Sequence, residues 1–301
     1  MKRGRLKLLF AATLALLAVI IGAFALRPLR PSPKVPPKPA QVLATVRQTA
    51  APGPEIPLAI FATLPVARRG IDCSEDARGC DLSCLAKNVA YIGRYYSSTG
   101  KAKTLSRAEG VAISRRGMRI MVFFQNGARS RRSFGAKLGE QNGAAAWNEA
   151  HAVGQPPGTA IYFCVDYPAP RADIEGYILP YFERLTFGME DARRAWNRRH
   201  PAFPAGRYSP GVYAGPPVIQ AILADPKRTL PSRPFLWLAM PPLWQDPHEP
   251  VEYSRYLKAR RWTCWQTRVA GICHRNGQPK AGFPCDEDEI GTAANGSFVL
   301  K

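Results

Sequence analysis

From Gly70 onward, short apolar runs alternate along the chain with stretches of helical periodicity. Apolar runs that suit strands occupy residues 70–73, 91–96, 118–125, 159–166, 211–214, 235–239 and 262–266, and a weaker one lies just before Asp286. Helical patterns occupy residues 82–89, 106–116, 143–153, 174–185 and 217–223, the second with Ser106 as N-cap and Glu109 completing a capping box. Such alternation is typical of repeated β-α units around a parallel sheet.

The number of these units favours one architecture over another. Eight strand candidates in about 220 residues suit a single-domain α/β fold, a (β/α)8 TIM-like barrel. The alternative is an open doubly wound sheet, but we find no glycine-rich nucleotide-binding fingerprint in the chain. The 301 residues are 46% hydrophobic and 21% charged, which is sufficient for a buried core.

The start of the chain has the pattern of an export signal. A basic start, Lys2 to Lys7, precedes an uncharged apolar run over residues 8–26, and Ala23-Phe24-Ala25 matches a cleavage site. The run also nearly suffices to span a bilayer, so an uncleaved membrane anchor stays open beside a cleaved signal peptide. We expect an exported protein, periplasmic or secreted.

A proline-rich segment follows, which reads PLRPSPKVPPKP over residues 28–39. Proline at this density predicts an extended spacer without a packed structure of its own. We therefore divide the chain into a signal peptide or membrane anchor (1–26), a spacer (27–67) and a barrel domain (68–301).

The chain has seven cysteines, which are Cys73, Cys80, Cys84, Cys164, Cys264, Cys273 and Cys285. In an exported protein they are disulfide candidates, with Cys164, inside an apolar run, as the odd buried thiol and the pairing of the others open. No CxxC pair occurs and His274 beside Cys273 is the one neighbouring imidazole, which is poor spacing for zinc. We expect neither a metal nor a cofactor.

The formal net charge of +20 suits polyanionic partners such as nucleic acid, anionic lipid or cell-wall polymers. The basic residues are scattered over separate segments, as in solvated loops and helix faces. The sequence shows neither a clustered acidic metal site nor an aromatic and basic strand platform, so we expect no nucleic acid. We expect a monomer.

Polar and aromatic residues that end the predicted strands are the candidate site, because barrels assemble their chemistry there. They are Asp72, Arg94, Tyr95, Gln125, Asp166, Tyr213, Trp237, Gln266 and Asp288. Structural roles stay open for several of them: an aspartate after a strand also caps turns, and Arg94 and Gln125 also suit hydrogen-bonding struts. Trp237 suits stacking on a sugar or packing in the core.

Several motifs together resemble a known family. They are Gly70-Ile71-Asp72, Tyr91-Ile92-Gly93-Arg94-Tyr95-Tyr96, the helix start Leu105 to Glu109, Ile161 to Tyr167, and Gly211-Val212-Tyr213. In this order they resemble a family of exported bacterial proteins, labelled as a domain of unknown function, that is glycoside-hydrolase-like and similar in its barrel to glycoside hydrolase family 25 lysozymes. The resemblance covers roughly residues 70–288 and implies an acidic barrel mouth and a cell-wall or other envelope glycan as partner.

Glycosidic cleavage normally needs two carboxyl groups that flank the bond. Asp72 and Asp166 are the candidate catalytic pair, and Glu287 or Asp288 enters the same mouth. The related lysozymes carry a second acid two residues after the strand-four aspartate, where this chain has Pro168. Two functions therefore stay open: a glycoside hydrolase in which another carboxylate supplies the acid, and a non-catalytic glycan-binding module on a degenerate hydrolase barrel.

Overall fold

The structure, a computed structural model, describes residues 65–100, 103–225, 230, 235–239, 263–275, 278–292 and 295–301. All of them belong to the unit Pro52–Lys301. The expected signal peptide or anchor and nearly all of the expected spacer lie outside the described residues. Within the described part of the chain, no helix has the length and apolar character to cross a membrane.

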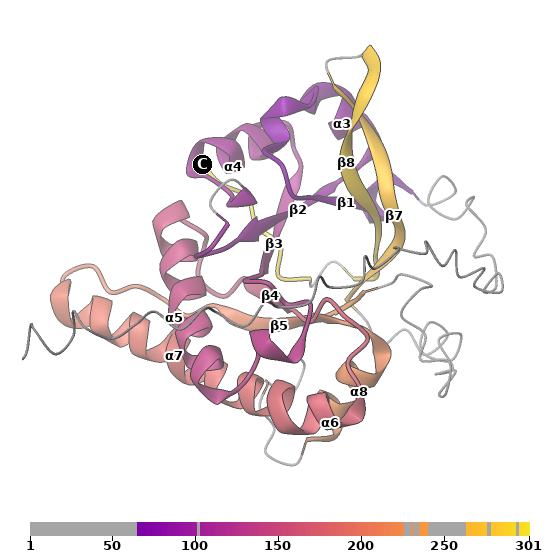
Figure 1. Cartoon of the computed structure of the whole chain (residues 1–301). Coiled ribbons are helices and arrows are strands. Elements are labelled where there is room, and N and C mark those ends of the chain that lie inside the picture. Colours follow the sequence, from indigo (N-terminus) through magenta and orange to yellow (C-terminus); the bar gives the residue numbers. More distant parts are fainter. Residues whose placement is uncertain are drawn as a thin grey trace, which may run out of the picture. The chain divides into compact units, whose positions relative to one another are not determined.

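Eight strands pair in chain order and close into a barrel (Figure 1). They are β1 (Arg69–Cys73), β2 (Tyr91–Tyr96), β3 (Arg119–Phe124), β4 (Ala160–Cys164), β5 (Ser209–Ala214), β6 (Phe235–Leu238), β7 (Cys264–Arg275) and β8 (Gln278–Ile290). Neighbours from β1 to β7 run parallel, whereas β8 is antiparallel to both β7 and β1. The α/β class is thus confirmed, but the regular (β/α)8 repeat is not.

The last two strands form a hairpin, drawn in gold in Figure 1, in place of a final strand-helix-strand unit. The pairing runs from Cys264 opposite Ile290 to Arg275 opposite Gln278. A parallel eighth strand was therefore the wrong expectation. The sequence carries a signal for the hairpin, because Asn-Gly at positions 276–277 is the dipeptide most typical of a two-residue hairpin turn.

Helices lie outside the sheet and follow the first five strands. They are α3 (Leu82–Asn88), α4 (Arg107–Arg115), α5 (Ala136–Val153), α6 (Arg171–Asp173), α7 (Leu179–Arg199) and α8 (Pro216–Ala224). Short 3-10 turns η1 (Val66–Arg68), η2 (Ala77–Gly79) and η4 (Arg131–Ser133) and the π-turn η5 (Ile174–Ile178) complete the described elements. Helices α5 and α7 are longer than predicted. The sequence did not indicate their additional turns, because these turns are largely polar and lack clear hydrophobic periodicity.

Helices α5 and α7 lie side by side and approach each other closely (Figure 1). A Cβ atom on Gly143 of α5 would collide with the carbonyl oxygen of Leu185. A Cβ atom on Gly188 of α7 would collide with the carbonyl oxygen of Glu140. Glycine at these positions therefore sets the distance between the two helices.

The final residues of the chain return to the start of the sheet. Phe298 forms an antiparallel bridge with Ile120 of β3, and the Tyr162 hydroxyl of β4 donates to the carbonyl oxygen of Asn295 at 2.7 Å. Arg119 donates to the Ser297 hydroxyl at 2.7 Å. This C-terminal tail, residues 295–301, thus joins β3 and β4 at their amino-terminal ends.

The cysteines do not follow the disulfide prediction. Cys84, Cys164, Cys264 and Cys285 carry thiols outside any disulfide. Cys164 is buried, as expected, but Cys264 and Cys285 are buried as well. Three disulfides among the other six cysteines are therefore not formed in this structure.

Candidate active site

Asp72, near the end of β1, is a buried acid whose hydrogen-bond partners come from β2 and β7. It is 3% exposed. Its carboxylate accepts the Tyr95 hydroxyl at 2.8 Å and Gln266 Nε2 at 3.3 Å. Burial and then the charge of Asp286 raise the pKa of Asp72 to about 7, although the two hydrogen bonds act in the opposite direction. Asp72 is therefore largely protonated below neutral pH.

Gln266 of β7 connects Asp72 to a second acid, Asp286 of β8. Gln266 Nε2 donates to Asp286 Oδ2 at 2.6 Å as well as to Asp72. The Tyr213 hydroxyl of β5 donates to Gln266 Oε1 at 3.0 Å and thereby fixes the orientation of the amide. The expected residues Tyr95, Tyr213 and Gln266 thus all support one carboxylate pair.

Asp166, directly beyond β4, is the third acid of the site. Its Oδ2 accepts Gln125 Nε2 at 3.0 Å and Arg129 Nε at 3.4 Å. Burial raises the pKa of Asp166, while Arg129, Gln125 and Lys103 act to lower it. The charge of Asp166 also contributes to the raised pKa of Asp72. Asp72 and Asp166 therefore lie at the same end of the barrel, as the strand-end pattern predicts.

Lys103 contacts one side chain that bonds to Asp72 and another that bonds to Asp166. Its Nζ donates to Gln125 Oε1 at 2.7 Å and lies 5.0 Å from the centroid of the Tyr95 ring. Gln125 in turn bonds to Asp166, and Tyr95 bonds to Asp72. We refer to Asp72, Asp166 and Asp286 as the acidic cluster.

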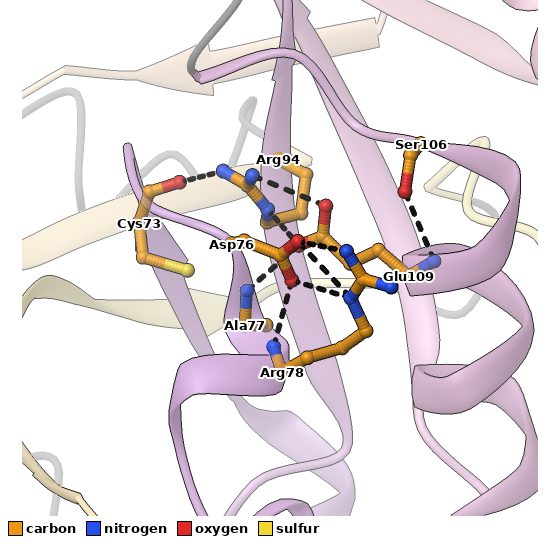
Figure 2. A network of polar contacts seen from close by, with 7 residues as sticks. All are labelled: Cys73, Asp76, Ala77, Arg78, Arg94, Ser106 and Glu109. Carbon is orange, nitrogen blue, oxygen red and sulfur yellow. Dashed lines mark hydrogen bonds and ion pairs between the residues drawn. The ribbon is translucent and has the colours of Figure 1, made fainter.

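Arg94 has a different place from the expected one. Figure 2 shows its guanidinium between Cys73 and Glu109: it donates to the Cys73 carbonyl oxygen and, through Nε, to Glu109 Oε1 at 2.5 Å. Both charged side chains are almost fully buried. Glu109 also accepts the Ala77 amide at 2.8 Å, while its own amide donates to the Ser106 hydroxyl. Arg94 therefore braces β1, β2 and α4 behind the acidic cluster rather than facing it.

Trp237 and Asp288 also lie deeper than expected. Trp237 is 1% exposed, with its ring centroid 4.3 Å from that of Phe123 and 5.3 Å from that of Tyr162. Its Nε1 donates to Asp288 Oδ1 at 3.2 Å, and Asp288 is 0% exposed. An enclosed ring offers no face to a sugar, so Trp237 belongs to the packed barrel interior.

Three polar residues of the site were not among the predicted ones: Lys103, Arg129 and Asp286. Asp286 had a usable signal, because residues two apart on a strand share a face and Asp288 was already a candidate. Lys103 and Arg129 lie outside the described strands. The periodicity of apolar residues does not predict the conformation of the segments that carry them.

Two carboxyl groups with different surroundings can divide the labour of acid and base chemistry. Burial and the neighbouring Asp286 favour the protonated form of Asp72. Arg129 and Lys103 favour the ionised form of Asp166 against its burial. Within the described residues, no group of three or more His, Cys, Asp or Glu side chains is arranged to hold a metal ion.

Comparison with known proteins identifies relatives in bacteria. Two Bacillus subtilis proteins, YbfG and FadG, are each 26% identical to this chain, over 180 and 153 residues. The matches cover 52% and 49% of this chain. The chain spans about a quarter of the length of these curated relatives, 23% and 25% respectively.

Two solved structures share the fold. The Tat-secreted protein Rv2525c of Mycobacterium tuberculosis, crystallised with L-tartrate, superposes with a TM-score of 0.53 and 18% identity, covering 76% of this chain and 98% of that one. The spore cortex lytic enzyme SleM of Clostridium perfringens superposes with a TM-score of 0.50 and 16% identity, covering 76% and 69%. At these identities the likeness concerns the fold.

The family assignment has independent support from the sequence. Residues 83–281 match the family described as Rv2525c-like, glycoside hydrolase-like domain. This range contains Arg94, Gln125, Asp166 and Gln266, and it covers more than half of the chain. The chain therefore belongs to the Rv2525c-like, glycoside hydrolase-like domain family.

Proposed function

We propose that this domain is a glycoside hydrolase that acts on peptidoglycan or another cell-envelope glycan. The observation that carries the proposal is the pair Asp72 and Asp166, two acids at one end of the barrel in unlike surroundings. Asp72, with a pKa raised to about 7 by burial and Asp286, supplies the proton to the leaving oxygen. Asp166, beside Arg129, supplies the negative charge that attacks the sugar or activates water.

Envelope glycan is the proposed substrate because of the descriptions of two proteins that share this fold. SleM is described as a spore cortex lytic enzyme, and Rv2525c as a Tat-secreted protein. Together with the signal-like residues 1–26, these descriptions support export to the periplasm or the medium. We further propose that the domain, residues 68–301, acts as a monomer, with residues 27–67 as its spacer and an uncleaved anchor as the alternative to release.

The architecture proposed for this function is a modified TIM barrel. Strands β1 to β7 and the helices after β1 to β5 follow the (β/α)8 plan, while the β7–β8 hairpin replaces the last unit. The replacement keeps an acid at the site, because Asp286 of β8 lies opposite Asp72 of β1.

A second function, glycan binding without cleavage, is favoured by Pro168. This residue follows Asp166 by two positions, where the resembling lysozymes carry an acid, and a prolyl ring has no proton to give. On this proposal the acidic cluster would accept hydrogen bonds from sugar hydroxyls.

Incubation with purified peptidoglycan separates the two functions. Wild-type protein is expected to release new reducing ends, and Asp72→Asn and Asp166→Asn are each expected to abolish the release while retention on the glycan persists. Asp76→Asn, at an acid bonded to Arg78 outside the cluster, is the matched control and should retain activity. Retention without reducing ends in the wild type would favour the binding module, and retention on DNA alone would contradict both.

A further inference from the structure

A basic cleft of about 420 Å³ lies beside helix α7, away from the acidic cluster. We define the basic cleft by Thr186, Glu190, Arg193, Arg194, Arg207 and Ser209. Trp147 and Tyr208, both largely buried, form an apolar part of its wall. Ser209 begins β5 whereas Tyr213, four residues on, contacts Gln266 of the site. About 13 Å of strand thus separates the two regions.

Three arginines of the cleft converge on one carboxylate, that of Glu190. Arg193 donates to it through Nε at 2.9 Å and Nη2 at 2.6 Å. Arg207 donates through Nε at 3.1 Å and Nη2 at 3.2 Å, and Arg194 through Nε at 3.0 Å. Three positive charges share one negative charge, so the cleft carries an excess of two positive charges.

Much of the donor capacity of these arginines is still open. Arg194 bonds only through Nε, so both of its terminal nitrogens lack a partner among the described residues. The Arg194 and Arg207 side chains are 62% and 73% exposed, while Glu190 is only 21% exposed. Glu190 therefore occupies Nε and Nη2 of Arg207 but only Nε of Arg194, and among the described residues it leaves the other terminal nitrogens of these two exposed side chains available. Thr186 and Ser209, two residues that carry hydroxyl groups, also line the cleft.

We propose that the basic cleft is an anion site that binds a phosphate group. A guanidinium presents its N–H groups in a planar fork that matches phosphate oxygens, and several such forks around one point select a multivalent anion. The excess of two positive charges equals the charge of a phosphate dianion. Glu190 pre-organises the forks, so that binding does not have to order three long side chains. The phosphate belongs to a lipid headgroup or to a soluble phosphate compound.

Titration with inorganic phosphate at low ionic strength tests the site. Wild-type protein is expected to bind saturably, and the double variant Arg194→Gln/Arg207→Gln should bind at least about tenfold more weakly, because it loses two charge-assisted contacts. Both side chains are largely exposed, so the variant should unfold at the wild-type temperature. Arg171→Gln, at another exposed arginine paired with a glutamate, is the matched control and should bind like the wild type.

Two further arms identify the source of the phosphate. Cosedimentation with phosphatidylglycerol vesicles, lost in the double variant, would assign a lipid headgroup; retention on a glycerol phosphate polymer, lost in the same variant, would assign a soluble phosphodiester. Asp166→Asn should leave phosphate binding unchanged, which separates this proposal from the proposed hydrolase. Equal phosphate binding by the wild type and the double variant, or no binding by either, would overturn it.

Discussion

Asp72 and Asp286 lie directly opposite each other across the antiparallel strands β1 and β8. Two like charges at such a position destabilise a sheet. Here Gln266 Nε2 donates to both carboxylates, at 3.3 Å and 2.6 Å, and the Tyr95 hydroxyl bonds to Asp72. The remaining repulsion is relieved when Asp72 holds a proton. The position of Asp286 opposite Asp72 therefore favours the protonated form of Asp72.

The raised pKa of Asp72 predicts that the protein loses stability as the pH rises. The pKa of Asp72 is about 7 in the folded protein, whereas the ordinary value of 3.8 applies to the unfolded chain. Between these pH values the folded protein therefore binds more protons than the unfolded chain does. Stability therefore falls by a few kcal/mol, in order of magnitude, from about pH 4 to pH 7. Asp72→Asn should flatten this slope, measured by urea unfolding at a series of pH values.

The slope, rather than the absolute stability, is the readout for Asp72→Asn, because an asparagine also changes the hydrogen bonds to Gln266 and Tyr95. Asp76→Asn, at an acid whose pKa is lowered by its hydrogen bond with Arg78, should leave the slope between pH 4 and pH 7 in place. An unchanged slope in Asp72→Asn would contradict the assignment of the proton to this residue.

Arg129→Gln should shift the pH profile of glycan cleavage or retention. Arg129 lowers the pKa of Asp166 against the effect of burial, so its removal raises that pKa and moves the acidic limb to higher pH. The side chain is 82% exposed, so solvent screens it and the shift should stay below about one pH unit. Added salt should reproduce the shift in the wild type. Arg131→Gln, at an arginine 4.0 Å from Asp173, should have no such effect.

The buried ion pair between Arg94 and Glu109 should dominate the stability of this part of the barrel. Arg94→Met leaves the Glu109 carboxylate uncompensated in the interior, and such a change typically costs about 3–5 kcal/mol. The double variant Arg94→Met/Glu109→Leu should recover much of this loss. Chemical unfolding measures both, and an Arg94→Met protein as stable as the wild type would contradict the role of the pair. Arg78→Gln, at an exposed pair, should cause no measurable change.

Close packing of α5 against α7 gives another prediction. Gly188→Ala places a methyl group against the Glu140 carbonyl oxygen and forces the helices apart, at a cost of about 3 kcal/mol or more. Gly176→Ala is the matched control, since nothing lies within 4 Å of its Cβ position. It should be neutral or stabilising by up to about 1 kcal/mol. Thermal unfolding of both variants compares the two positions.

Strand-end reasoning placed several candidate residues correctly at one end of the barrel, because it depends on geometry alone. The carboxyl ends of parallel strands meet at one end of a barrel. There, hydrogen bonds join Tyr213, Gln266 and Asp72, and another joins Gln125 to Asp166. The charge of Asp166 in turn acts on the pKa of Asp72. The same reasoning failed for β8, because apolar content alone does not distinguish a parallel strand from one arm of a hairpin.

The failure at Arg94 has a different cause. Successive residues of a strand face opposite sides, so Arg94 and Tyr95 cannot both point into the barrel. Tyr95 reaches Asp72, and Arg94 reaches Glu109 of α4 on the other side. The positions of Lys103 and Arg129 depend on loop conformations, which the pattern of apolar residues does not specify.

The contacts of residues 295–301 with β3 and β4 have a consequence for the order of folding. Its contacts join residues far apart in the chain: Tyr162 with Asn295 over 133 positions, and Arg119 with Ser297 over 178. Contacts between such distant residues slow folding, because a long loop must close before they form. The contacts of residues 295–301 with β3 and β4 are therefore expected to form later in folding than the contacts between neighbouring strands.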